Sequence, residues 1–185
     1  MTYKLIIFDL DGVIVKSNSI LRNVIDECDK NDCLEIFAMS LIDCLETSTG
    51  SIPCVRWTPK PCILSIIEVF SGKCAGEYEP IKEVVDFIKR IRGYKMAILS
   101  NDTRWFIEEH LERLGISEKF DVVISGEDVG KLKPDPEGLI EILKETKIDP
   151  HEAIYYGSGH IDDITGKKVK VKTVSSLNEL KREVS

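Results

Sequence analysis

Short apolar runs alternate along this chain with segments whose apolar residues recur at helical spacing. The helical segments span residues 79–91, 103–114, 137–146 and 176–183, and each follows one of the apolar runs. Parallel strands that are buried on both faces are continuous apolar runs, and helices connect them. The alternation therefore predicts an α/β fold with a doubly wound, Rossmann-like parallel sheet. Its five predicted strands are residues 5–7, 96–99, 122–124, 153–156 and 169–174.

Polar side chains follow four of these five strands. Ligands of doubly wound sheets bind beyond the carboxyl ends of the strands. One site at this edge of the sheet is therefore the simplest interpretation. The residues are Asp9 and Asp11, Ser100 and Asn101, Lys131 and Lys133, and the run 158–163.

Asp9 and Asp11 form a carboxylate pair at the end of the first strand. Side chains alternate across a strand, so the two carboxylates point to the same side, and Gly12 then lets the chain turn. Unpaired buried charge is costly, so such a pair is typical of a site mouth with a cation or a shared proton. Taken alone, Asp-x-Asp-Gly is more typical of an ordinary polar turn.

Residues 16–78 differ in character from the rest of the chain. They combine helical spacing with a segment rich in proline and glycine, so we expect a small helical cap inserted into an α/β core of residues 1–15 and 79–185. All six cysteines fall in this insertion, and the absence of Cys-x-x-Cys disfavours a zinc site. They are Cys28, Cys33, Cys44, Cys54, Cys62 and Cys74.

The redox state of these cysteines is open at this point. Ordinary cytosol would keep them as reduced thiols. However, the chain has no Gln and is rich in Lys, Glu and Ile, a thermophile-like composition, and hyperthermophile cytosol tolerates disulfides. Six cysteines allow about 15 full pairings, so spacing alone does not assign one.

Composition narrows the class of protein. The 185 residues are enough for one core domain with an insertion. A net charge of −7 argues against a nucleic-acid surface, and we interpret the one basic cluster, residues 167–172, as a solvated strand edge. No apolar run approaches the ~20 residues that span a bilayer, and no charged leader precedes the first strand. We therefore expect a soluble cytoplasmic protein without nucleic-acid or membrane partners.

Four segments resemble, in order and spacing, the motifs of the haloacid dehalogenase superfamily. The resemblance covers the core and is to phosphatase-type members with a helical C1-like cap, similar to phosphoglycolate phosphatases and β-phosphoglucomutases. No motif of the insertion itself can be matched. The four segments are residues 8–13 (FDLDGV), 99–101 (LSN), 133–136 (KPDP) and 157–162 (GSGHID).

The resemblance implies phosphoryl transfer through a covalent intermediate. Asp9 would be the nucleophile that forms an aspartyl phosphate. Asp11 would protonate the leaving oxygen and later activate water. A second aspartate at this place also separates phosphatases from the dehalogenase branch, which lacks it.

Four further residues receive roles from the same resemblance. Ser100 would donate its hydroxyl to a phosphoryl oxygen, with the Asn101 backbone amide beside it. Lys133 is assigned the role of neutralising the phosphoryl charge, because it directly precedes the proline of the third motif as in the family. Gly12, in the turn after the carboxylate pair, is placed with Asn101 among the substrate-binding residues.

The fourth motif departs from the family pattern at Ser158, where relatives carry an aspartate that binds Mg²⁺. The expected metal ligands are Asp9 and Asp11, with Asp162, Asp163 and Ser158 from the fourth motif. A neutral hydroxyl in place of a carboxylate should weaken Mg²⁺ binding. Three explanations are open: a neighbouring aspartate replaces the missing ligand, the site works at high metal concentration, or catalysis is impaired.

The insertion should select the substrate. Arg56, near Trp57 and Lys60, is a candidate anion-binding residue, although an exposed loop with one buried tryptophan explains the same pattern. We expect a Mg²⁺-dependent phosphatase of small phosphorylated metabolites, a monomer or homodimer. The alternatives are a phosphomutase of the same family and a catalytically impaired protein that binds a phosphorylated ligand.

Overall fold

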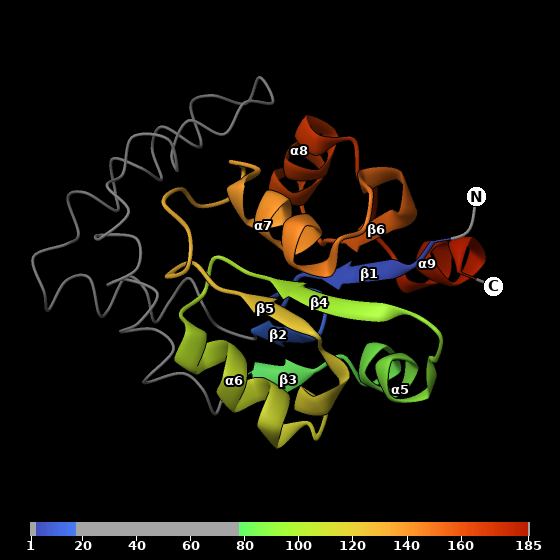
Figure 1. Ribbon diagram of the computed structural model, residues 1–185. Helices are drawn as coiled ribbons and strands as arrows, with labels where there is room; N and C mark the ends of the chain where they lie inside the picture. The colour runs from blue at the N-terminus through green and yellow to red at the C-terminus, as the bar shows by residue number, and fades with distance from the viewer. Residues whose placement is uncertain (1–2, 18–77, 185) are drawn as a thin grey trace, which may run out of the picture. The chain divides into compact units, whose positions relative to one another are not determined.

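A five-stranded parallel sheet forms the centre of the protein (Figure 1). The computed structural model describes residues 3–17 and 78–184, which belong to one compact unit, Met1–Ser17 with Tyr78–Ser185. The strand order is β5-β4-β1-β6-β7, so the first strand of the chain lies in the middle. The strands are β1 (Leu5–Phe8), β4 (Lys95–Leu99), β5 (Val122–Ile124), β6 (Ala153–Tyr156) and β7 (Lys172–Val174).

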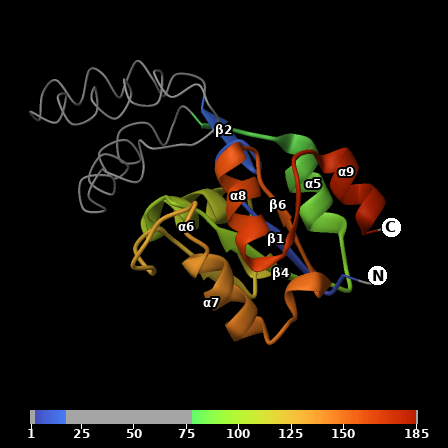
Figure 2. The same cartoon turned by 90° about the horizontal axis from the view of Figure 1, so that it is seen from above.

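Helices cover both faces of this sheet, which confirms the predicted doubly wound α/β fold. Figure 1 shows α7 and α8 on one face and α5 and α6 on the other, and Figure 2 shows the same arrangement from above. Two 3₁₀ turns, η1 (Ser117–Lys119) and η2 (Pro150–Glu152), precede β5 and β6. The helices are α5 (Lys82–Arg90), α6 (Arg104–Arg113), α7 (Glu137–Thr146), α8 (His160–Val169) and α9 (Leu177–Glu183).

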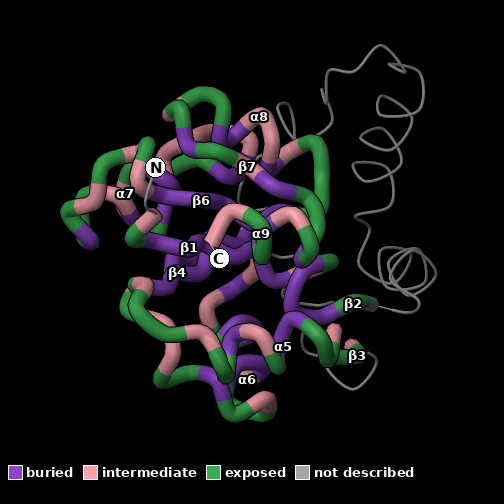
Figure 3. The backbone as a smooth tube through the Cα atoms, turned by 90° about the vertical axis from the view of Figure 1, so that its right-hand side faces the viewer, coloured by how far each residue is buried: buried purple, intermediate pink, exposed green. Residues whose placement is uncertain are grey.

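The central strand β1 is buried along its whole length, as the colour of Figure 3 shows. Ile6 and Phe8 belong to a core cluster with side chains of α5, α6 and α9, whereas Leu5 and Ile7 alternate with them and are equally inaccessible to solvent. Phe8 pairs with Ile98 of β4 and Tyr156 of β6. The central strands thus end nearly level, which brings the residues that follow them together.

A two-stranded antiparallel ribbon, β2 (Val15–Ser17) with β3 (Tyr78–Pro80), follows the first turn. Both predicted junctions between core and insertion, 15/16 and 78/79, fall inside this ribbon. The prediction that Glu79 and Pro80 open a helix is wrong, because Glu79 pairs with Lys16 and Pro80 with Val15. Helix α5 begins at Lys82 instead, with Ile81 as its N-cap residue.

The C-terminal predictions also need correction. No helix was predicted between the fourth and fifth strands, but α8 begins at His160 and continues through Val169. Lys170 then adopts the left-handed conformation with φ 61°, and its N–H donates to the Gly166 and Lys167 carbonyls. The helix and its cap therefore take Val169 and Lys170 from the predicted strand, and β7 is shorter than predicted. Lys167 lies on a helix rather than on a strand edge.

The predictions for residues 18–77 lie outside the described residues. They include the helical cap, the six cysteines and the anion-binding role of Arg56. Among the helices of residues 3–17 and 78–184, none is both long and apolar enough to span a membrane.

Candidate active site

Asp9 leaves the end of the central strand and is 7% exposed. Its backbone N–H extends the ladder by donating to the Tyr156 carbonyl at 2.9 Å. Its Oδ1 atom accepts from the Leu10 N–H and from Lys133 Nζ, each at 2.8 Å. One carboxylate oxygen is therefore fixed by two donors, and none of the described residues donates a hydrogen bond to Oδ2.

Lys133 reaches Asp9 from the loop between β5 and α7 and is 6% exposed. Its ammonium donates to Asp9 Oδ1 and Asp162 Oδ1 at 2.8 Å each, to the Tyr155 hydroxyl at 3.0 Å and to the Leu99 carbonyl at 3.4 Å. Two buried carboxylates thus surround one buried cation, an arrangement that is costly unless all its polar groups are paired.

Asn101 fixes the backbone that carries this lysine. Its Oδ1 accepts from the Lys133 N–H at 2.8 Å, and its Nδ2 donates to the Lys133 carbonyl at 3.2 Å. The next peptide bond, Lys133–Pro134, is cis. The Asn101 side chain thus has a structural role that the sequence did not indicate. The substrate contact expected of its backbone amide stays a prediction.

Asp162 lies in the first turn of α8, where a carboxylate is favoured by the helix dipole. Its Oδ1 accepts from Lys133 and from the Tyr155 hydroxyl at 2.7 Å, and its Oδ2 accepts from the Gly159 N–H at 3.2 Å. The adjacent Asp163 instead accepts from Lys167 at 2.5 Å, one helical turn away. Of these two neighbouring aspartates, the structure brings only Asp162 to Asp9 through the lysine.

Ser100 directly follows β4, at the predicted strand end, and is buried. Its hydroxyl donates to Asp102 Oδ2 at 2.5 Å and accepts from the Asp102 N–H at 3.2 Å. Asp102 is not among the predicted site residues, and Thr103 rather than Asp102 caps α6 by accepting from the Phe106 N–H. The carboxylate of Asp102 therefore belongs with the other acidic groups of this edge.

The turn after Asp9 meets the loop after β6. Gly12 has φ 74°, a conformation that favours glycine, and a Cβ there would lie 2.5 Å from Ser158 Oγ. The Ser158 hydroxyl donates to the Asp11 carbonyl at 3.2 Å. Ser158 thus lies beside the backbone of the carboxylate pair, and its role as a metal ligand stays a prediction.

Burial raises the pKa of Asp9 to about 7, because the attraction of the Lys133 ammonium only partly offsets desolvation and Asp162 adds repulsion. Burial likewise raises the pKa of Asp11 to about 6, and the negative charge of Asp102 acts in the same direction. For Asp162, burial is outweighed by Lys133, which lowers the pKa of the carboxyl. Of Asp9, Asp11 and Asp162, only Asp162 is therefore held firmly ionised, and the other two titrate near neutrality.

The oxygen atoms at this edge suit Mg²⁺ in kind. The Asp9 carboxylate, the Asp11 carbonyl and the Ser158 hydroxyl are hard donors, and Mg²⁺ usually takes one or two carboxylates and completes its shell with water. Asp162 is already bound by Lys133 and Tyr155. Within the part of the chain that the structure describes, no group of three or more His, Cys, Asp or Glu side chains could hold a metal ion. The residues fit Mg²⁺ with a single carboxylate ligand, Asp9.

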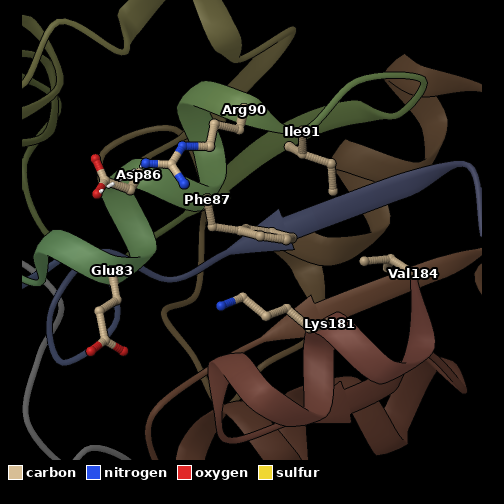
Figure 4. A pocket seen from close by; sticks show the side chains of 7 residues that line it. All are labelled: Glu83, Asp86, Phe87, Arg90, Ile91, Lys181 and Val184. Carbon is tan, nitrogen blue, oxygen red and sulfur yellow. Dashed lines mark ion pairs between the residues drawn. The ribbon is translucent and has the colours of Figure 1, made fainter.

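A separate pocket lies between α5 and α9 (Figure 4). Figure 4 shows Phe87 of α5 and Lys181 of α9 as two of its lining residues. No predicted site residue lines this pocket, so the pocket gives no support for a second catalytic centre. Its lining residues are Glu83, Asp86, Phe87, Arg90, Ile91, Lys181 and Val184.

Comparison with known proteins places this arrangement in a family. A family model described as haloacid dehalogenase-like hydrolase matches residues 6–175. The chain belongs to this family. Pyrophosphatase PpaX from Bacillus mycoides (strain KBAB4) is 27% identical over 189 residues, which cover 95% of this chain and 84% of that protein. The prediction of a phosphatase-type hydrolase of this superfamily is thereby confirmed.

Solved structures show the same fold. A protein from Bacteroides fragilis described as a haloacid dehalogenase-like hydrolase has a TM-score of 0.71 at 21% identity, covering 98% of this chain and 93% of that one. The HAD-hydrolase YfnB from Bacillus subtilis, described as bound to magnesium, has a TM-score of 0.69 at 14% identity, covering 100% and 99%. These similarities show the fold alone.

Proposed function

We propose that this hydrolase is a Mg²⁺-dependent phosphatase of small phosphorylated metabolites that works through an aspartyl phosphate at Asp9. The observation that carries the proposal is the buried cluster in which the Lys133 ammonium bridges Asp9 and Asp162 at 2.8 Å each. A cation held at this distance from a nucleophilic carboxylate is placed to stabilise the charge of a transferring phosphoryl group.

The two carboxylates of the first motif would divide the chemistry. Asp9 Oδ2 attacks phosphorus as the bond from phosphorus to the leaving oxygen breaks, and Asp11 protonates that oxygen. Asp11 then takes a proton from water as the water oxygen attacks the aspartyl phosphate, which releases phosphate and restores Asp9. A pKa of about 6 suits Asp11 to both directions of proton transfer near neutral pH.

The other residues would bind and orient the phosphoryl group. Ser100 would exchange its hydrogen bond with Asp102 for one with a phosphoryl oxygen, and the backbone N–H of Asn101 would lie beside it. Bound Mg²⁺, held by Asp9, the Asp11 carbonyl and Ser158, would neutralise phosphoryl charge and favour the ionised form of Asp9.

Pyrophosphate is a second candidate substrate, since the curated relative at 27% identity is named a pyrophosphatase. A phosphomutase would use the same residues and return the phosphoryl group to the substrate. Release of free phosphate from pyrophosphate, compared with isomerisation of a sugar phosphate, distinguishes these activities.

Ser158 motivates the remaining alternative, a protein that binds a phosphorylated ligand without turning it over. By the family resemblance its hydroxyl stands where relatives have a metal-binding carboxylate, and among the described residues it donates a hydrogen bond only to the Asp11 carbonyl. Catalysis that appears only in Ser158→Asp would favour this alternative, whereas full activity of the natural protein would exclude it.

The test of the main proposal is hydrolysis of p-nitrophenyl phosphate at several Mg²⁺ concentrations. We expect turnover by the natural chain and a loss of at least about a thousandfold in Asp9→Asn, as is typical when a nucleophile is removed. Asp86→Asn on the exposed surface of α5 is the matched control. Absence of turnover at every Mg²⁺ concentration would refute the proposal.

A further inference from the structure

Tyr155 places a hydroxyl inside the buried cluster around Lys133. This hydroxyl donates to Asp162 Oδ1 at 2.7 Å and accepts from Lys133 Nζ at 3.0 Å. The side chain is fully buried. A tyrosine hydroxyl can donate once and accept, and here both capacities are directed at charged partners of the site.

The sheet explains why a residue of β6 reaches this point. Tyr155 pairs with Ile7 of β1, so it lies beside the central strand two residues before Asp9. Its neighbour Tyr156 belongs to the core cluster on the other face of the sheet. Of two consecutive tyrosines, alternation along the strand therefore directs only Tyr155 toward the lysine.

The ammonium of Lys133 needs to be held because its four-carbon stem is flexible. The ammonium has three N–H groups, and its three shortest contacts are to Asp9, Asp162 and Tyr155. Asn101 fixes only the lysine backbone. Without the tyrosine hydroxyl, the ammonium would lose one acceptor and Asp162 Oδ1 would lose one donor, so the lysine could move away from Asp9.

We propose that Tyr155 is a positioning residue, which holds the Lys133 ammonium against Asp9 through its hydrogen bonds to Lys133 and Asp162. The inference rests on the proposed phosphatase function. Displacement of the ammonium would cost more stabilisation of the phosphoryl charge in the transition state than in the bound ground state. Therefore kcat should fall more than KM changes.

Kinetics of Tyr155→Phe and Tyr156→Phe provide the first test, because both variants remove one hydroxyl from consecutive residues of one strand. We expect kcat to fall about tenfold in Tyr155→Phe with KM within about threefold, since small misplacements of catalytic groups cost rate. Tyr156→Phe should keep the kcat of the natural chain. Equal kcat in the two variants would overturn the inference, as would a loss confined to KM.

A double variant separates positioning from general structural support. In a Lys133→Met background, Tyr155→Phe should cause no further loss of kcat, because no ammonium remains to be positioned. The same tenfold loss in both backgrounds would instead show that Tyr155 acts independently of the lysine.

A crystal structure of Tyr155→Phe gives the decisive geometric readout, whether or not the protein turns over. We expect Lys133 Nζ to leave its 2.8 Å hydrogen bond with Asp9 Oδ1. An unchanged contact in the variant would overturn the inference. Absence of turnover by the natural chain would refute the proposed function, and this structure would still decide whether Tyr155 positions the lysine.

Discussion

The two sides of Asp9 differ in how completely their polar groups are paired. On the lysine side, Lys133, Asp162 and Tyr155 are almost inaccessible to solvent and form hydrogen bonds of 2.7–3.0 Å with one another. On the other side, Asp11 is only partly buried, Ser158 is exposed, and a single 3.2 Å hydrogen bond joins them. We call these the closed side and the open side.

This difference separates two requirements of phosphoryl transfer. Stabilising charge works best when the groups are fixed before reaction, since they then need no reorganisation. Proton transfer and metal binding require access to substrate, water and ions. In the proposed mechanism the closed side would meet the first requirement and the open side the second, so variants of the two sides should fail in different ways.

The largest effect is expected from breaking the closed side with Lys133→Met. Two buried carboxylates would lose their cation, which should lower the free energy of unfolding by about 3–5 kcal/mol and activity by about a hundredfold or more. Lys131→Met is the matched control, because Lys131 is exposed and its one ion pair among the described residues, with Asp135, is 3.8 Å long. Urea unfolding and kcat of both variants provide the measurement, and equal losses would contradict the comparison.

On the open side, the pH dependence of Asp11 gives the next largest effect. Asp11 must be protonated to donate to the leaving oxygen, and its protonated fraction falls as pH rises through about 6. For an alkyl phosphate at saturating Mg²⁺, where the metal would keep Asp9 ionised, kcat/KM should therefore fall about tenfold per pH unit above pH 6. p-Nitrophenyl phosphate, whose leaving group is stable as an anion, should show a smaller decline. Identical pH profiles for the two substrates would exclude Asp11 as the acid.

The smallest effect is expected from strengthening Mg²⁺ binding on the open side with Ser158→Asp. A second carboxylate beside the Asp11 carbonyl should lower the Mg²⁺ concentration for half-maximal activity by about tenfold, because metal ligands of this kind contribute chiefly through charge. Ser158→Asn offers a neutral side chain of nearly the same size as a control. A metal dependence unchanged by Ser158→Asp would remove Ser158 from the proposed ligands.

Much of the fold could be predicted because local pattern and tertiary environment agree. The bounds of β5, β6 and α7 match their predictions, since each apolar run or periodic segment ends at turn residues. Helix α8 was missed because Gly166 lies within it and its apolar residues are few. That glycine is required by packing, since a Cβ there would lie 2.1 Å from Thr173 Oγ1.

The site could be predicted only where residues carry a sequential motif. Asp9, Lys133 and Asp162 belong to motifs, and the structure brings them together. Tyr155 was read as part of an apolar strand, because nothing local indicates that its hydroxyl meets a lysine 22 residues earlier. A contact between distant segments, rather than local pattern, gives Tyr155 its place in the site. Asp102 received no site role from the sequence, because it belongs to none of the four motifs.

The central claim, that Asp9 carries the phosphoryl group, can be tested by trapping the intermediate. In Asp11→Asn the base that activates water is absent, so the intermediate should accumulate with p-nitrophenyl phosphate, whose departure needs no acid. After acid quench, peptide mass spectrometry should find phosphate on Asp9, and hydroxylamine should remove it. Release of p-nitrophenol by this variant with no phosphate on Asp9 would contradict the account.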